Sequence, residues 1–185
     1  MYRILDIGCG VGKYKSNKSN VRVIGLDRIF LPDVDVVYDL EKLPLPFKDN
    51  RFDEIRAHHV LEHVINFVPL VHELWRITKP NGIIKVWVPF YSSYHGFSHP
   101  THVRFFTPFT FDFFCEGTYE VCPNGKKLFN LKRRYVIFSK GKIISKLNPI
   151  INPLINMNQE FYCRFFAWTL PASEIYFELQ VVKDE

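Results

Sequence analysis

Three glycines at alternate positions follow an apolar run near the start of the chain, in the stretch Leu5–Gly12 (LDIGCGVG). Glycine tolerates sharp backbone turns and lets a ligand approach the main chain closely. A strand that runs into such a loop is typical of a cofactor-binding turn at the carboxyl edge of a parallel sheet. The spacing alone is weak evidence, because a plain tight turn uses the same glycines. The later segments must therefore decide between the two interpretations.

Acidic residues follow the next two expected strands. Runs of β-branched and apolar side chains at residues 21–26 and 34–38 predict these strands, and Asp27 and Asp39 come directly after them. A carboxylate at the end of the second strand can accept both hydroxyl hydrogens of a ribose. Asp39 would lie where an adenine amino group could donate to it. Both could instead be common turn carboxylates, but Asp27 lies 15 residues beyond Gly12, which favours the ribose role.

Histidines gather after the ends of two later strands. Residues 52–57 and 83–88 predict the fourth and fifth strands, and residues 90–107 form a long loop after the fifth. The histidines concerned are His58, His59, His63, His95, His99 and His102. Strand ends in such a sheet face the ligand crevice, so these side chains and Glu62 are candidates for contact with the reacting groups, and the histidines are candidates for proton transfer. The alternative is that they only bond to backbone groups. No metal is expected, because no helix or carboxylate partner supports a ligand set.

Helical periodicity is clear in one central segment. Apolar residues recur with helical spacing from Phe67 to Trp75, with Asn66 as a plausible cap and residues 79–82 as the stop. In contrast, residues 13–20 are polar and lack such periodicity, so any helix after the glycine loop spans at most one or two turns.

The second half of the chain predicts a late antiparallel addition to the sheet. Helices are expected from Thr107 to Cys115, with proline at the first helical position, and from Glu160 to Trp168. Strands are expected at residues 129–138 and 174–182. A late pair of strands around a helical insert is typical of an antiparallel extension of a parallel sheet.

Charge and composition exclude several classes of protein. The formal net charge of +5 comes partly from basic clusters at residues 13–18 and 126–134, which are more often solvated faces than nucleic-acid sites. The four cysteines lack the paired spacing of a zinc site. No signal peptide and no apolar run of about 20 residues is present, so we expect no membrane span and a cytoplasmic location.

Taken as a set, four segments resemble class I S-adenosylmethionine-dependent methyltransferases. They are Leu5–Gly12, Ile24–Asp27 (IGLD), Tyr38–Pro44 (YDLEKLP), and His59–Val64 (HVLEHV) followed by Leu74–Gly82 (LWRITKPNG). The resemblance covers about the first half of the chain. It implies an α/β fold with a Rossmann-like open twisted sheet, mostly parallel with an antiparallel C-terminal strand pair, in three α/β/α layers. It also implies one domain at 1–185, with a cofactor-binding half at 1–89 and an acceptor side at 90–185.

By that resemblance, the chain binds S-adenosyl-L-methionine and releases S-adenosyl-L-homocysteine. The residues expected at the cofactor are Asp6, Gly8, Cys9, Gly10, Gly12, Asp27, Arg28, Asp39, Leu40, His58 and His59. Asp6 and Gly8 would lie near its amino-acid end, Asp27 would hold the ribose, and Asp39 and Leu40 the adenine.

The second half resembles the family only loosely. The segments His99–His102 (HPTH) and Phe105–Pro108 (FFTP) are similar to a stretch in small-molecule and sugar-pathway methyltransferases. The expected reaction is methyl transfer to an O or N atom of an unidentified acceptor, most simply a small molecule or saccharide. The candidate bases are His59, His63, His99 and His102, with His95 beside them; His102 and His59 are the first choices.

Three alternatives remain open at this stage. A nicotinamide-dependent oxidoreductase shares the sheet, but its third glycine would fall at Lys13. A catalytically weak methyltransferase-fold binding module is kept open by the short helix after the glycine loop and the absence of a helix before the first strand. Those same departures could require a second subunit, as in a homodimer. Methyl transfer to RNA or protein would use the basic clusters.

Overall fold

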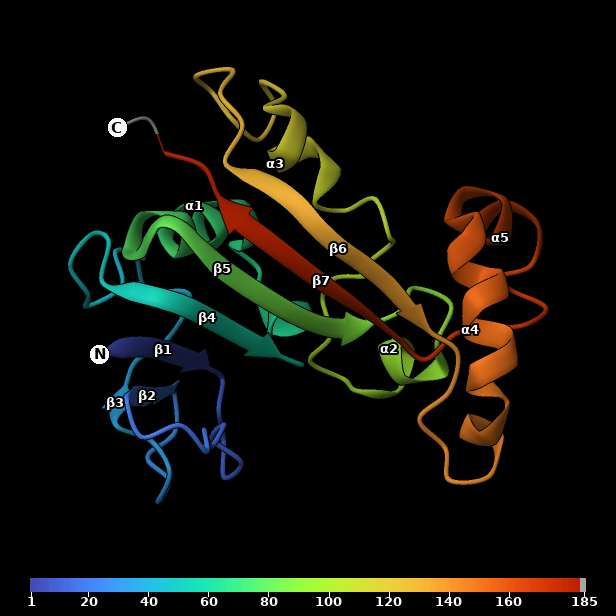
Figure 1. Cartoon of the computed structure of the whole chain (residues 1–185), viewed down its shortest axis with the longest axis horizontal. Coiled ribbons are helices and arrows are strands. Elements are labelled where there is room, and N and C mark those ends of the chain that lie inside the picture. Colours follow the sequence, from blue (N-terminus) through green and yellow to red (C-terminus); the bar gives the residue numbers. More distant parts are fainter. Residues whose placement is uncertain (184–185) are drawn as a thin grey trace.

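The computed structural model describes residues 1–183, which build one mixed sheet flanked by helices (Figure 1). The strand order is β3-β2-β1-β4-β5-β7-β6. The strands are β1 Tyr2–Ile7, β2 Val21–Asp27, β3 Val36–Val37, β4 Phe52–His58, β5 Thr78–Pro89, β6 Phe129–Ile137 and β7 Glu174–Val181. Strands β1 to β5 pair in parallel, whereas β7 pairs antiparallel with both β5 and β6. The predicted mostly parallel sheet with an antiparallel C-terminal pair is confirmed.

The main core lies between the sheet and helix α1 (Phe67–Ile77). The strands contribute buried apolar side chains to it, among them Leu5 and Ile7 of β1 and Ile55 and Ala57 of β4. Helix α1 buries an apolar stripe against them: Phe67, Leu70, Val71, Leu74 and Ile77. A helix with apolar residues at this spacing gains its stability by packing that stripe on a sheet. The predicted helix is therefore confirmed, although it ends two residues later than Trp75.

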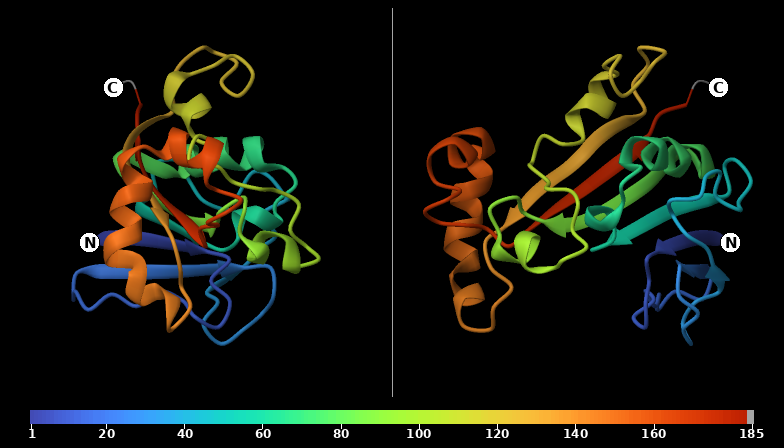
Figure 2. Two further views of the ribbon diagram at one scale, coloured as in Figure 1. Left: turned by 90° about the vertical axis from the view of Figure 1, so that its right-hand side faces the viewer. Right: turned by 180° about the vertical axis from the view of Figure 1, so that it is seen from behind.

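The opposite face of the sheet has a sparse helical layer. Figure 2 shows α1 and α4 (Asn148–Met157) on opposite sides of the sheet, with α4 beyond the outer strand β6. Over β1 and β4, residues 13–20 form no helix, which agrees with the prediction of at most one or two helical turns there. The ring of Tyr14 lies instead on the Arg56 guanidinium, 3.8 Å from ring centroid to Cζ. Polar residues without apolar periodicity have no stripe to bury, so this segment covers the sheet in an extended form.

Several predicted boundaries are wrong. Asn66 makes no side-chain cap; Glu41 instead accepts hydrogen bonds from the backbone N–H groups of Ile65 and Asn66. Residues 79–82 belong to the start of β5. The loop at 90–107 contains a short helix, α2 (Tyr94–Ser98).

The remaining corrections fall in the second half. The helix expected at Thr107–Cys115 is shorter, α3 (Asp112–Glu116), because Thr107 and Thr110 bond to each other and hold the chain in turns ahead of it. Helix α5 (Gln159–Phe165) is shorter than the expected Glu160–Trp168, and α4 was not predicted. Two 3-10 turns, η1 (Leu61–His63) and η2 (Ile144–Leu147), complete the elements. Within residues 1–183, no helix is long and apolar enough to cross a membrane.

Candidate active site

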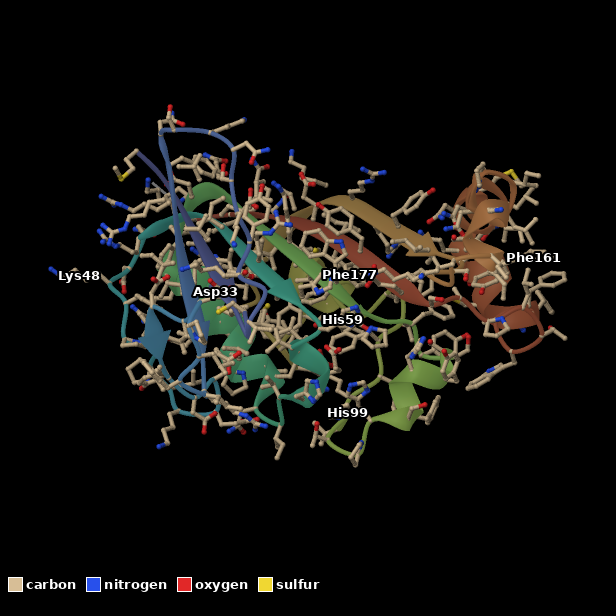
Figure 3. The ribbon with its side chains drawn as sticks, turned by 90° about the horizontal axis from the view of Figure 1, so that it is seen from below. Asp33, Lys48, His59, His99, Phe161 and Phe177 are labelled. Carbon is tan, nitrogen blue, oxygen red and sulfur yellow. The ribbon has the colours of Figure 1, made fainter. Side chains whose placement is uncertain are left out.

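Two adjoining cavities open at the carboxyl ends of the parallel strands. The first has a volume of about 500 Å³ and lies beside the glycine loop and the ends of β2 and β3. The second has a volume of about 440 Å³ and lies between η1, α2 and the start of β7. His59, His63 and His99 line both cavities. Figure 3 shows His59 and His99 on the same side of the molecule, from two segments distant in sequence.

The glycine loop needs two of its glycines for different reasons. Gly8 has φ +64°, and a Cβ there would lie 2.4 Å from Cγ2 of Val60. Gly10 has φ +53°, but a Cβ there would meet no atom within 4 Å. Both backbones are in the left-handed region, which disfavours other residues. Gly8 therefore packs the loop against the segment after β4, while Gly10 leaves its outer side open.

Asp6 and Asp27 hold the backbone of this loop. The buried carboxylate of Asp6 accepts a hydrogen bond from the N–H of Tyr14 at 2.7 Å. Asp27 accepts from the N–H of Gly10 at 2.9 Å with one oxygen and from that of Ile29 at 3.0 Å with the other. Burial raises the pKa of Asp6, against the hydrogen bond from Tyr14, which lowers it. These two acids therefore shape the loop whether or not a ligand is bound.

The predicted cofactor residues divide into two groups. Those that line the first cavity are Gly8, Asp27, Arg28, Asp39, Leu40 and His59. Those that do not line it are Asp6, Cys9, Gly10, Gly12 and His58. Burial raises the pKa of the Cys9 thiol to about 11. Cys9, Gly10 and Gly12 belong to the glycine loop itself, whereas the ring of His58 lies against those of His59 and Trp87.

Sequence reasoning missed several residues of the first cavity. Tyr38, Glu41, Val60, Val64 and Ile65 also line it. Glu41 fixes the wall of the cavity next to α1, because its carboxylate accepts hydrogen bonds from the two backbone N–H groups ahead of that helix. Tyr38, Glu41, Val60 and Val64 lay within the segments that suggested the family resemblance, so the signal was present but was not assigned to the site.

His59 is held between two carboxylates. Its Nε2 lies 2.7 Å from Oε2 of Glu174, and its Nδ1 lies 3.2 Å from Oε1 of Glu62. Lys140 also donates to Glu174, at 2.6 Å. Burial lowers the pKa of His59, but the hydrogen bonds to Glu174 and Glu62 outweigh it and raise that pKa to about 9. A ring that is protonated and donates from both nitrogens has no lone pair, which argues against His59 as a base.

Neither Glu174 nor Lys140 was singled out from the sequence. Glu174 is 1% exposed, and burial raises its pKa, but the hydrogen bonds from His59 and Lys140 hold that pKa below its ordinary value. The other oxygen of Glu62, Oε2, is buried without a hydrogen-bond partner. Burying a carboxylate oxygen without a hydrogen-bond partner costs free energy of folding. Glu62, which carries this oxygen, lines the second cavity.

Three histidines form a second cluster in the second cavity. The ring centroids of His63, His99 and His102 lie 4.7 to 5.1 Å apart. The hydroxyl of Thr101 bridges Nδ1 of His63, at 2.6 Å, and Nδ1 of His99, at 2.9 Å. Burial lowers the pKa of His63, and the neighbouring His102 and His99 lower it further, so that ring is neutral at pH 7.

His102 has the arrangement that a base requires. Its Nδ1 lies 2.9 Å from the carbonyl oxygen of Gly96, which can only accept, so Nδ1 carries the hydrogen. In a neutral ring the other nitrogen, Nε2, then has a lone pair. His95 also lines the cavity, with its ring centroid 3.9 Å from that of Tyr94.

Two of these groups have metal-ligand spacing. One ligand atom from each of His63, His99 and His102 lies within 4.8 Å of the others, and the same holds for His58, His59 and Glu174. In the second group the ligand atoms of His59 and Glu174 already bond to each other. The expectation of no metal stays a prediction.

Comparison with known proteins shows which proteins this chain is similar to. Residues 5–86 match the family model described as methyltransferase domain. A probable S-adenosylmethionine-dependent methyltransferase of Mycolicibacterium smegmatis is 34% identical over 98 residues, which are 46% of this chain and 37% of that protein. A demethylmenaquinone methyltransferase of Renibacterium salmoninarum is 30% identical over 122 residues, which are 58% of this chain and 46% of that protein.

Solved structures agree on the fold. A SAM-dependent methyltransferase from Archaeoglobus fulgidus superposes with a TM-score of 0.63 at 16% identity, over 97% of this chain and 86% of that one. The YcgJ protein of Bacillus subtilis superposes with a TM-score of 0.60 at 15% identity, over 100% of this chain and 93% of that one.

The matched segment, residues 5–86, is therefore similar to a methyltransferase domain, and the whole chain has the fold of solved S-adenosylmethionine-dependent methyltransferases. S-adenosylmethionine is the methyl donor of that domain class. The chain spans less than half the length of the curated relatives it matches.

Proposed function

We propose that the protein is a methyltransferase that moves a methyl group from S-adenosylmethionine to an O or N atom of a small molecule or saccharide. The observation that carries the proposal is the pair of adjoining cavities with shared histidines. One cavity has the acids and glycine expected for the donor, and the other is lined by five histidines, His59, His63, His95, His99 and His102. Donor and acceptor bound in this way would meet at His59, His63 and His99, which is the positioning that an in-line transfer requires.

In the first cavity, different residues would hold the ribose, the adenine and the methionine part of the donor. Asp27 keeps free lone pairs on both oxygens beyond its two backbone bonds, so it can still accept from a ribose. Asp39 and Leu40 would take the adenine, and Gly8 would admit the methionine part. Asp6 would act indirectly, through the loop backbone. When bound, S-adenosylmethionine supplies an electrophilic methyl group.

In the second cavity, His102 is the residue best placed to take a proton. A hydroxyl acceptor must lose its hydrogen as the methyl group arrives, and Nε2 of His102 can accept it. His59, as a cation, would instead orient an acceptor oxygen by donating to it when one of its carboxylate bonds opens. His63 and His99 would line the junction between the cavities. Lys140 and Glu174 would set the charge at the cavity floor.

The alternatives lose support for specific reasons. The basic residues that suggested RNA are in part engaged, since Lys13 pairs with Asp35 at 2.9 Å and Arg134 pairs with Asp112 at 2.9 Å. A cavity of about 440 Å³ suits a small acceptor better than a polymer. We also infer that residues 1–185 act as one domain, because β5 of the first half pairs with β7 of the second along seven residue positions. A homodimer remains one way to close the donor site.

The test is calorimetry with S-adenosylmethionine. We expect the wild-type protein to bind it, and Asp27→Ala to weaken binding at least tenfold, which corresponds to about 1.4 kcal/mol. Glu116→Ala, which removes an exposed carboxylate on α3, is the matched control and should bind normally. Absence of binding by the wild-type protein would favour a binding module without methyltransferase activity. Binding of a nicotinamide nucleotide in its place would favour the oxidoreductase.

A further inference from the structure

The insert between β6 and β7 exposes a row of large apolar side chains, which we call the apolar ridge. Its most exposed members are Ile143 (80%), Ile150 (67%), Leu154 (62%), Met157 (81%), Phe165 (59%) and Trp168 (68%). They come from the segment around η2, from α4, and from α5 and the turn after it. Helix α4 lies against both η2 and α5, and exposed apolar residues of this number on adjoining segments mark an interaction surface in a globular protein.

The ridge is not explained by the packing of the insert itself. Helix α4 attaches to the outer strand β6 through asparagines: Asn156 accepts from the N–H of Val136 and Asn152 from that of Phe138, both at 2.8 Å. Tyr162 and Ala167 anchor α5 in the interior. Helix α4 therefore buries Asn152 and Ile155 against the protein, yet its remaining large apolar residues Ile150, Leu154 and Met157 are exposed. An ordinary surface helix has polar residues on its outer face.

The charges around the ridge indicate its partner. Between residues 139 and 173 the cations are Lys140, Lys142, Lys146 and Arg164, and the sole acid is Glu160. Lysines beside exposed aromatic and aliphatic side chains are typical of helices that lie in the headgroup layer of an anionic membrane. A symmetric contact between two copies of the ridge would instead bring the lysines of both chains together.

We propose that the apolar ridge docks on an anionic lipid surface. Lys140, Ser173 and Glu174, at the two ends of the insert, also line the acceptor cavity. Docking would therefore hold that cavity near the headgroup layer. If the proposed function is correct, the methyl acceptor would itself be carried in the lipid layer. The docking of the ridge does not depend on the proposed function.

The first experiment measures sedimentation with vesicles of phosphatidylcholine, with and without phosphatidylserine. We expect binding to the anionic vesicles, weakening as salt is raised. Lys142→Glu/Lys146→Glu and Leu154→Ser/Phe165→Ser should each lose at least tenfold in affinity. The controls are Lys42→Glu/Lys48→Glu and Phe113→Ser, which change exposed residues away from the ridge. Figure 3 shows Lys48 at the opposite end of the molecule from Phe161 of the insert.

A second readout places the contact on the ridge. Lipids brominated in the acyl chain should quench tryptophan fluorescence in the wild-type protein and much less in Trp168→Phe. Calorimetry with S-adenosylmethionine should be unchanged in all these variants, so failure of docking and failure of donor binding are distinguishable. The proposal is overturned if the wild-type protein ignores anionic vesicles, or if both ridge variants bind as well as their controls. It is also overturned if ultracentrifugation shows a dimer that Leu154→Ser/Phe165→Ser dissociates.

Discussion

Replacing Glu174 by glutamine should convert His59 from a cation into a neutral ring at pH 7. In the wild-type protein, the carboxylate of Glu174 lies 2.7 Å from Nε2 of His59, and the pKa of His59 is raised to about 9. A glutamine side chain can still accept from Lys140 with its oxygen, but its amide then donates to Nε2. Only a neutral ring can accept there. We expect the pKa of His59 to fall to within about one unit of its ordinary value, because Glu62 alone remains beside it.

The same change has a calculable effect on stability. A pKa raised from 6.5 to about 9 corresponds to a ceiling of roughly 3 kcal/mol, but the His59 side chain is 36% exposed, so solvent screening reduces this to about 1–2 kcal/mol. Because the folded pKa is the higher one, the contribution is complete below pH 6.5 and disappears as the pH rises through 9. Glu174 has a lowered pKa, so its own contribution is present above pH 4.5 and is lost as the pH falls through its folded pKa.

Two measurements check this reasoning. Proton NMR of the imidazole ring gives the pKa of His59 in both proteins, and urea unfolding at pH 6 and pH 9.5 gives the stability. The loss in Glu174→Gln should appear at pH 6 and shrink at pH 9.5. Glu178→Gln is the control, since Glu178 lies on the same strand and accepts from Tyr176 instead. A wild-type pKa below 7, or a pKa still near 9 in Glu174→Gln, would refute the argument.

Three further predictions concern the loop, the base and the second half of the fold. Gly8→Ala should lower the free energy of unfolding by about 2–4 kcal/mol, and Gly10→Ala should lower it by about 1 kcal/mol. Both positions have a positive φ, but only at Gly8 would the added Cβ also clash with another side chain. Equal losses of stability in thermal unfolding would contradict this. Nitrogen NMR at pH 8 should show the hydrogen of His102 on Nδ1, and finding it on Nε2 would remove His102 as the base. Asp112→Ala should lower the free energy of unfolding by about 1 kcal/mol, because it releases Arg134 from α3, and an unchanged urea midpoint would count against that role.

The first half of the fold was predictable because its signals are local. A short apolar run ahead of the glycine loop identifies β1, and the helical spacing of apolar residues identifies α1. These patterns exist because each element buries one face on the same core. The position of Asp27 follows from the end of β2, since parallel strands present their carboxyl ends at one edge.

The insert was not predictable by the same rule. Helix α4 contains Pro149 and Pro153, and its apolar residues Ile150, Leu154 and Met157 are exposed although Ile155 is buried. Its attachment depends on hydrogen bonds from Asn152 and Asn156 to the edge of β6. A periodicity rule assumes that the apolar face is the buried one, so it fails where polar side chains make the contact. The start of α3 was misplaced for a related reason, because the bonds between Thr107 and Thr110 hold turns where the proline rule predicts a helix.

The sequence by itself predicted the class of the domain and the edge of the sheet where its candidate site lies. The glycine loop, Asp27 and the strand-four histidines are each set by chain position relative to a strand end. Only the tertiary structure decided which histidine is charged. Glu174 lies 115 residues from His59 along the chain, yet 2.7 Å from its ring. A proton's affinity for a ring depends on the charges around it in space, and these are known only once β7 is placed beside β5.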